Sequence, residues 1–423
     1  MKLSGIFMIF LFMSFISCDK EDVLPPILVV NTPLALSNFN VLEYISVQGS
    51  ASDETNIEYV ELKLLNNDLV SVSNQIVLNS NELNFNFNAN ILIDDIHLSS
   101  GNYFLKVAVS DGKNVTSSYV EILLSAVPLV LKKTYVVSSN INSFNLYEID
   151  GATVSLVESF QGNYESSVSN SYNQYLFFGS DLEGYGYDPD FNYIPWNIAS
   201  IFSPYQYFNE SICCEEDHLL YVSHGNGTVK GYDDNGNVIY SCSMNVNEYP
   251  ENLLVNQQKI FVEVFYTNFN TDLVVYYKGS GAESHRLTIN KDIVKLIPKS
   301  EDQLYLLVND ANESEFFIYT SSVNGIWSPH SMPSGIVYDA VSISENELII
   351  AHQTGLLRYT YDNNSLVAIV PNISFKNVKY DQLNGLIVAS FGSELRYYSN
   401  LGVPIGVVNT PEPIENFHFY YNK

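Results

Sequence analysis

The chain has 423 residues, of which 47 are acidic and 19 basic, and its formal net charge at pH 7 is −28. So negative a surface repels nucleic acid and anionic lipid headgroups, and neither is expected as a partner. Hydrophobic residues make up 46% of the chain, with 31 Tyr and 24 Phe, which is ample for large cores in two or three domains. The four cysteines are too few for a disulfide scaffold.

The first 17 residues have the pattern of a signal peptide. Lys2 supplies a short basic region, and an unbroken apolar stretch from Ile6 to Met13 precedes Ser17 and Cys18. The stretch is too short to span a membrane. A cysteine after a small residue at this place resembles the lipobox of bacterial lipoproteins, although Phe15 stands where Leu is usual. The resemblance implies cleavage before Cys18 and its diacylation, with a plain secretory peptide as the alternative.

Residues 18–25 form a short acidic linker that contains Asp19, Glu21 and Asp22. It resembles the surface-export signal of Bacteroidetes lipoproteins, and the alternative is a solvated linker. The resemblance implies a protein that is lipid-anchored in the outer membrane and displayed on the cell surface. Two acyl chains anchor a protein stably, whereas one chain does not.

Residues 26–125 alternate apolar and polar side chains in several short runs, among them Ile45–Gly49, Tyr59–Leu64 and Tyr103–Val109. Turn residues such as Asp53-Glu54 and Asp111-Gly112 separate the runs, which predicts a compact antiparallel sandwich. The stretch Ser100–Gly112 resembles the penultimate strand and turn of bacterial immunoglobulin-like domains. Tyr103 is then the corner tyrosine, and the resemblance implies a spacer module.

After a linker at 126–132, residues 133–423 repeat a strand-rich unit about every 42 residues. The period is marked by a tyrosine in a short apolar run, at Tyr147, Tyr187, Tyr232, Tyr277, Tyr319, Tyr359 and Tyr397. Such a period is typical of a four-stranded propeller blade, and seven blades fit. The units resemble bacterial seven-bladed propellers of the quinoprotein-like or lactonase-like kind. The fold class predicted for the whole chain is therefore all-β, an immunoglobulin-like sandwich followed by a seven-bladed β-propeller.

The repeat begins out of phase, since Tyr135-Val136-Val137-Ser138 is already a second strand. The missing first strand is supplied by Asn416–Tyr420 at the C-terminus, and pairing of the two would close the ring and remove its exposed edges. In the same scheme, Cys213 and Cys214 lie in an innermost strand and Cys242 lies in the outermost strand of that blade. These strands are not adjacent, so the prediction is three buried free thiols.

Charged residues recur where each innermost strand begins. We call them the strand-start residues: Glu165, Glu210, Glu251, Asp292, Asp339, Lys376 and Glu415. Six acids and one base around the mouth of a channel would suit a cation such as calcium, or a basic ligand. The alternative is that the acids accept backbone hydrogen bonds or point outward.

Two histidines, His224 and His352, follow equivalent second strands in the third and sixth blades. They could share a divalent transition metal with the acids, or be exposed loop residues. No other cofactor is expected. Aromatic residues in two loops, Tyr185–Trp196 and Ser203–Phe208, could stack on sugars or pack in the core.

These features favour a non-enzymatic, monomeric surface lipoprotein whose propeller loop face binds a protein or a glycan. The first alternative is an extracellular propeller hydrolase or lyase acting on a glycan polymer, with Glu210 and Glu251 as participants. The second is a periplasm-facing scaffold in outer-membrane assembly. The sequence contains no nucleophile motif of the Gly-x-Ser-x-Gly type.

Overall fold

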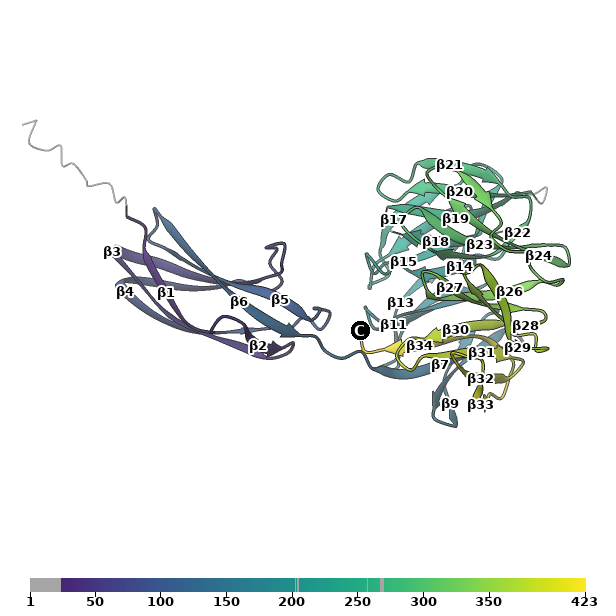
Figure 1. Ribbon diagram of the computed structural model, residues 1–423, viewed down its shortest axis with the longest axis horizontal. Coiled ribbons are helices and arrows are strands. Elements are labelled where there is room, and N and C mark those ends of the chain that lie inside the picture. The colour runs from purple at the N-terminus through teal and green to yellow at the C-terminus, as the bar shows by residue number, and fades with distance from the viewer. Residues whose placement is uncertain (1–23, 202, 204, 257, 267–269) are drawn as a thin grey trace, which may run out of the picture. The chain divides into compact units, whose positions relative to one another are not determined.

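The computed structural model describes residues 24–201, 203, 205–256, 258–266 and 270–423, and every regular element in them is a β-strand (Figure 1). The chain divides after Pro128 into two compact units, which are described separately below. The predicted signal peptide and lipidated Cys18 lie outside the described residues. No helix in the part of the chain that the structure describes has the length and hydropathy of a membrane span.

The first unit is one hydrogen-bonded set of six strands in the order β1-β3-β5-β6-β2, with β4 also paired to β3. All neighbours are antiparallel except β2 and β6. Alternate residues of the strands, such as Ile45 and Val47 or Leu105 and Val107, are buried in one apolar core. The strands are β1 (Ile27–Thr32), β2 (Ser37–Asn40), β3 (Tyr44–Leu65), β4 (Ile76–Leu92), β5 (Gly101–Ser110) and β6 (Val115–Ser125).

Two local predictions for this unit can be compared with the structure. The Tyr103 hydroxyl donates a hydrogen bond to the Ser99 carbonyl at 3.0 Å, as expected for a corner tyrosine. The turn predicted at Asp53-Glu54 is wrong, because β3 continues through it. Asp53 instead accepts a hydrogen bond from the Thr55 backbone within an unpaired stretch between Ser52 and Ile57, so the turn residues form an irregularity inside one long strand.

In the second unit, the residues that the structure describes form seven four-stranded antiparallel sheets. Their first strands contact one another in succession, and the β34 sheet contacts the β10 sheet, which is the arrangement of a β-propeller. In order from the innermost strand, the first four sheets are β10 (Tyr164–Asn170), β11 (Tyr175–Ser180), β12 (Glu183–Asp188), β13 (Tyr193–Ala199); β14 (Phe208–Cys213), β15 (Leu220–His224), β16 (Thr228–Tyr232), β17 (Val238–Ser243); β18 (Glu248–Asn256), β19 (Lys259–Tyr266), β20 (Thr271–Tyr277), β21 (Glu283–Thr288); and β22 (Asp292–Pro298), β23 (Gln303–Asp310), β24 (Glu313–Thr320), β25 (Gly325–Trp327).

The remaining three sheets include the one that joins both ends of the unit. They are β26 (Val337–Ser344), β27 (Glu347–His352), β28 (Gly355–Thr360), β29 (Ser365–Pro371); β30 (Asn377–Asp381), β31 (Leu386–Phe391), β32 (Glu394–Ser399), β33 (Pro404–Asn409); and β34 (Ile414–Tyr421), β7 (Leu131–Asn140), β8 (Ser143–Asp150), β9 (Thr153–Gln161).

The predicted closure is confirmed, because C-terminal β34 is the innermost strand beside β7. Asn416, Phe417 and His418 pair with Val137, Val136 and Tyr135 in antiparallel register. Phe417 and Tyr420 are fully buried there. The strand therefore contributes large apolar side chains to the core as well as backbone hydrogen bonds.

All seven marker tyrosines lie in the third strand of a sheet, as the period predicts. In two sheets the buried ring is the neighbouring tyrosine. Tyr276 is buried while Tyr277 is exposed, and Tyr398 is buried beside the half-buried Tyr397. Bulges occur in the pairing of the third strand to its outer neighbour in these two sheets and in four others, so a bulge alone does not explain the shift by one residue.

The three cysteines of the described residues are free. Cys214 and Cys242 are buried and Cys213 is partly buried, with Cys213 in the innermost and Cys242 in the outermost strand of one sheet. Burial raises the pKa of each thiol, which keeps the thiols protonated at neutral pH.

Candidate functional site

Bulges at the start of the innermost strands determine where the strand-start residues point. Glu165 and Glu415 are the unpaired residues of two such bulges. Glu210 and Asp339, in contrast, are the first paired residues after their bulges, opposite Ser223 and Ala351. Residues aligned by sequence therefore occupy different structural positions, and the structure divides the seven into separate groups.

One group places two strand-start acids beside two lysines of other innermost strands. Lys295 Nζ lies 3.3 Å from an Asp339 carboxylate oxygen, and the other Asp339 oxygen accepts a 3.0 Å hydrogen bond from the backbone nitrogen of Val378. Burial raises the pKa of Glu210, an effect that Lys295 opposes, Asp339 reinforces and Lys379 opposes. We call Glu210, Lys295, Asp339 and Lys379 the channel tetrad. The formal charges of its two acidic and two basic side chains cancel.

A chain of hydrogen bonds extends from the tetrad across the closing strand. Lys379 Nζ lies 3.2 Å from His418 Nδ1, and His418 Nε2 lies 2.7 Å from Ser167 Oγ. Ser167 Oγ is in turn 2.8 Å from the Tyr164 hydroxyl. Burial, followed by the charge of Lys379, lowers the pKa of His418 well below its usual value, so the imidazole is neutral.

Three other strand-start residues join neighbouring sheets. The Glu165 carboxylate accepts hydrogen bonds from the backbone nitrogens of Tyr207 and Phe208, at 3.2 and 2.8 Å, on the way into the next innermost strand. Lys376 forms an ion pair with Glu415, which also accepts a 2.6 Å hydrogen bond from Ser139. The Glu165 contacts correspond to the alternative that the acids accept backbone hydrogen bonds, whereas Glu415 is paired with side chains.

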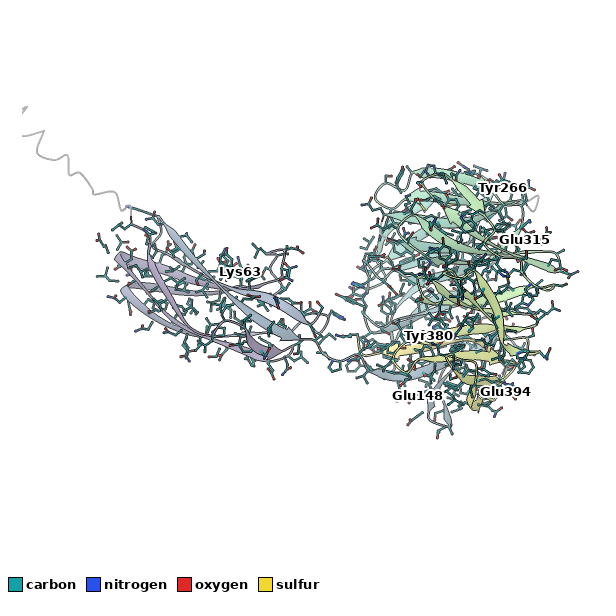
Figure 2. All side chains as sticks on the ribbon, viewed as in Figure 1. Lys63, Glu148, Tyr266, Glu315, Tyr380 and Glu394 are labelled. Atoms are coloured by element: carbon teal, nitrogen blue, oxygen red, sulfur yellow. The ribbon has the colours of Figure 1, made fainter. Side chains whose placement is uncertain are left out.

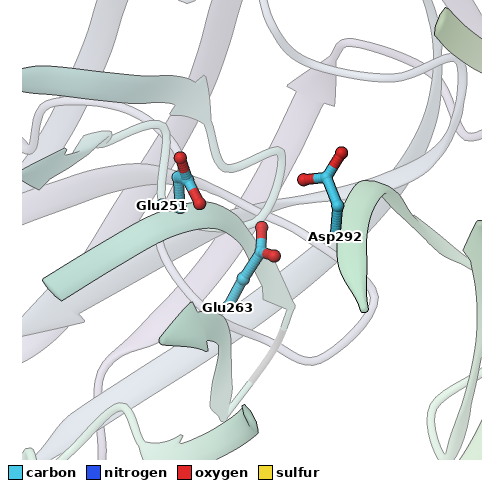
Figure 3. Close-up of side chains that lie close together, drawn as sticks. All are labelled: Glu251, Glu263 and Asp292. Carbon is cyan, nitrogen blue, oxygen red and sulfur yellow. The ribbon is translucent and has the colours of Figure 1, made fainter. Parts of the chain in front are cut away.

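The last two strand-start residues, Glu251 and Asp292, meet a buried acid of a second strand, Glu263. Figure 3 shows the three side chains directed toward one another, and one oxygen from each lies within 4.8 Å of the others. Glu263 is 1% exposed and accepts hydrogen bonds from the Ile293 backbone at 2.8 Å and the Asn252 amide at 2.7 Å. Burial and then the charge of Glu251 raise its pKa well above the usual value. Such an oxygen set is the kind that calcium takes.

The two histidines hold equivalent places at the ends of their second strands, opposite Phe208 and Val337. Both side chains are fully buried, so they are not exposed loop residues. His224 Nε2 is 2.9 Å from the Tyr232 hydroxyl, and His352 Nδ1 is 2.8 Å from Thr354 Oγ1. Among the described residues, the group with metal-binding spacing contains neither histidine.

An aromatic triad lies near the acidic cluster. Tyr205 precedes β14, and its ring centroid is 4.6 Å from Tyr249 and 4.8 Å from Phe265, which face each other across β18 and β19. Tyr205 is 38% exposed, so the triad forms part of the surface. Tyr249 is only two residues before Glu251 along β18, which puts ring faces and carboxylates at the same end of the sheet.

A cavity of about 640 Å³ opens where innermost strands end. Lys295 lines it, and so do Ser342 and Tyr380, which is labelled in Figure 2. Lys295 is the member of the channel tetrad that lines this cavity.

Sequence reasoning missed Glu263, Lys295, Lys379, Ser167 and His418. For three of them a signal existed. Glu263 is the one charged residue in the run Ile260–Phe265, and Lys295 is the one charged residue in the run Ile293–Pro298. Lys379 stands between the apolar side chain of Val378 and the ring of Tyr380 in β30. A charge inside a buried strand is costly unless it is paired or faces a cavity, and for that reason it marks a site.

No known protein family matches the sequence, and no characterised protein matches it significantly. The fold is similar to the β-propeller domain of Cps50 (Swd1) from Myceliophteria thermophila, with a TM-score of 0.48 and 15% identity over 60% of this chain and 88% of that one. It is also similar to a chain of the mitotic checkpoint complex, with a TM-score of 0.46 and 11% identity over 60% of this chain and 83% of that one. Function is therefore argued from side chains.

Proposed function

We propose that this protein is a lipid-anchored surface lipoprotein of the bacterial outer membrane, in which an immunoglobulin-like module carries a seven-bladed propeller that binds an extracellular protein or glycan without chemical conversion. Cys18 and the acidic residues that follow it support the anchor and the surface display. Seven four-stranded sheets in the second unit support the blade count.

The observation that carries the binding function is the aromatic triad of Tyr205, Tyr249 and Phe265, in which Tyr249 lies on the same strand as Glu251, two residues away. Rigid aromatic rings supply contact area at little entropic cost, and they are the preferred anchors of binding surfaces. Carboxylates next to them accept hydrogen bonds from sugar hydroxyls or from basic side chains. The combination suits a glycan or a basic protein segment.

The alternative of a glycan hydrolase or lyase would use the same carboxylates. Glu263 has the raised pKa of a general acid, but its oxygens are engaged by Ile293 and Asn252 and its side chain is buried. Glu251 and Asp292 would therefore be the carboxylates that contact a substrate. Reducing-end release from any glycan that binds would separate this alternative from simple binding.

Protein that begins at Asp19 should be screened on a glycan array and by thermal shift with basic peptides, beside Tyr205→Ala and a matched control, Tyr193→Ala. Tyr193 is 51% exposed on the outermost strand β13. We expect Tyr205→Ala alone to weaken binding about tenfold or more, as loss of an aromatic anchor does. Equal loss in both variants would refute the triad as the binding surface.

The anchor and its orientation need a separate experiment on cells. We expect protease added to intact cells to digest the wild-type propeller and Cys18→Ser to leave the membrane fraction. Protection of the wild-type protein until the outer membrane is broken would instead favour the periplasm-facing scaffold.

A further inference from the structure

Lys379 differs from the other lysine of the channel tetrad in its partners. Lys295 is held by Asp339 at 3.3 Å, whereas Lys379 joins no ion pair among the residues that the structure describes. Its Nζ contacts a neutral nitrogen, His418 Nδ1, at 3.2 Å, and it lies 5.4 Å from the centre of the Phe417 ring. The side chain is partly exposed on an innermost strand. Its amine is therefore held by a neutral imidazole rather than by a carboxylate.

The surroundings of Lys379 favour its neutral form. Burial lowers its pKa to about 8, Asp339 opposes the shift, Lys295 adds to it and Glu210 opposes it. Lys295 remains charged because Asp339, its largest influence, raises its pKa. An ordinary lysine has a pKa near 10.4, so Lys379 carries a far larger neutral fraction at pH 7.5. A neutral lysine amine is a nucleophile.

His418 is placed to accept the proton that such a reaction releases. It is 3% exposed, and its Nε2 is fixed at 2.7 Å from Ser167 Oγ, which is itself 2.8 Å from the Tyr164 hydroxyl. With Nε2 bound to this pair of hydroxyls, Nδ1 is directed at Lys379. The two hydroxyls can donate or accept, so the chain tolerates either imidazole tautomer.

We propose that Lys379 is a reactive amine in the propeller channel that takes a small aldehyde or ketone as an imine. The Nζ lone pair forms a bond to the carbonyl carbon, and the carbonyl π electrons move to oxygen. The proton of the attacking nitrogen passes by way of His418 Nδ1 to that oxygen, and the carbinolamine then loses water to leave C=N. One amine and one carbonyl give one imine and one water, with no oxidant or reductant. A cavity of about 640 Å³ that is lined by Lys295 and by Tyr380, the residue after Lys379 in β30, is the opening from which the carbonyl compound would approach.

The test is site-resolved labelling of the folded chain from Asp19 with glycolaldehyde and sodium cyanoborohydride, which reduces imines to stable amines for peptide mass mapping. At pH 7.5 we expect Lys379 to be labelled about tenfold faster than the average lysine, since its larger neutral fraction outweighs its lower intrinsic nucleophilicity. The rate should rise with pH to a midpoint near 8. Labelling of Lys379 at the rate of the other lysines, or a midpoint above 10, would overturn the proposal.

Two variants make the result specific. Lys379→Arg keeps the positive charge and should remove the fast label without affecting other lysines. Lys295→Gln removes the like charge, so the midpoint for Lys379 should move to higher pH and labelling at pH 7.5 should slow several-fold. If Lys295→Gln is unstable, His418→Gln serves in its place, because loss of the proton acceptor should also slow labelling. An unchanged rate in the folded variant would count against the mechanism.

Discussion

Asp339 and Lys295 form the ion pair that joins two adjacent sheets at the centre of the propeller, with 3.3 Å between Nζ and the nearer carboxylate oxygen. The other oxygen of Asp339 accepts a hydrogen bond from the Val378 backbone in the next sheet. One acidic side chain therefore connects three consecutive innermost strands, β22, β26 and β30.

This connection predicts that Asp339→Asn destabilises the propeller. The amide removes the counter-ion of Lys295 and weakens the hydrogen bond from Val378, so we expect the free energy of unfolding to fall by about 2 kcal/mol in urea titrations. The matched control is Glu394→Gln, which removes an ion pair with Arg396 whose carboxylate is more exposed than that of Asp339. It should cost at most about 0.5 kcal/mol. Similar losses in the two variants would contradict a special role for Asp339.

Deletion of β34 tests how the ring is closed. A chain that ends after Pro413 lacks the strand paired with β7 and loses buried Phe417 and Tyr420, so we expect loss of cooperative unfolding and rapid proteolysis of residues 129–413. A chain that ends after Tyr421 retains the whole strand and should unfold cooperatively. The first unit should stay protease-resistant in both, because its core is its own. A cooperative transition in the shorter chain's propeller would contradict closure by this strand.

The propeller could be predicted from sequence because its signal is repeated. Because seven tyrosines recur at similar spacing, an irregular spacing in one repeat does not hide the period. The first repeat starts at its second strand, with Tyr135, and Asn416–Tyr420 supplies the missing first strand. The long strand β3 could not be predicted, because Asp53-Glu54 has the composition of a turn whether the chain reverses there or only loses pairing.

The candidate site was harder to predict, for a reason of geometry. A bulge adds one residue to a strand and changes which side chain faces the channel, and Glu165 and Glu210 differ in this respect although each lies near the start of its strand. His418 and Ser167 are 251 residues apart in sequence. Only closure of the ring brings them together.

Glu251→Gln should stabilise the protein most at high pH. Burial and Glu251 raise the pKa of Glu263, so the folded state binds this proton more tightly than the unfolded state, and stability decreases as pH rises from about 4.3 through the raised pKa. Removing the Glu251 charge lowers that pKa. We expect a gain of about 1 kcal/mol at pH 8 and a smaller one at pH 5, measured by urea unfolding. Glu215→Gln, at an exposed acid, is the control and should show no such pH dependence.

The wild-type protein and Glu251→Gln also test whether the three acids bind calcium. An ion held by Glu251, Glu263 and Asp292 would raise the melting temperature of the wild type as calcium is added, because it binds only the folded state. The rise should be much smaller in Glu251→Gln. A wild-type melting temperature that does not change when calcium is added would show that these three acids do not bind calcium.

His224 should limit stability in acid. Burial, followed by the charge of Lys230, lowers its pKa to about 3, so the folded state resists a proton that the unfolded state takes up near pH 6.5. Its contribution is fully present above pH 6.5 and is lost as pH falls toward 3, by about 2 kcal/mol at pH 5. His224→Phe removes the hydrogen bond to Tyr232, which lowers the unfolding free energy at every pH. It also removes the loss of stability in acid, because phenylalanine takes up no proton when the protein unfolds. We therefore expect a shallower decrease in unfolding free energy between pH 7 and pH 5 than in the wild type. His330→Phe, in a surface loop, should keep the wild-type slope, and an unchanged slope in His224→Phe would show that this imidazole does not resist protonation.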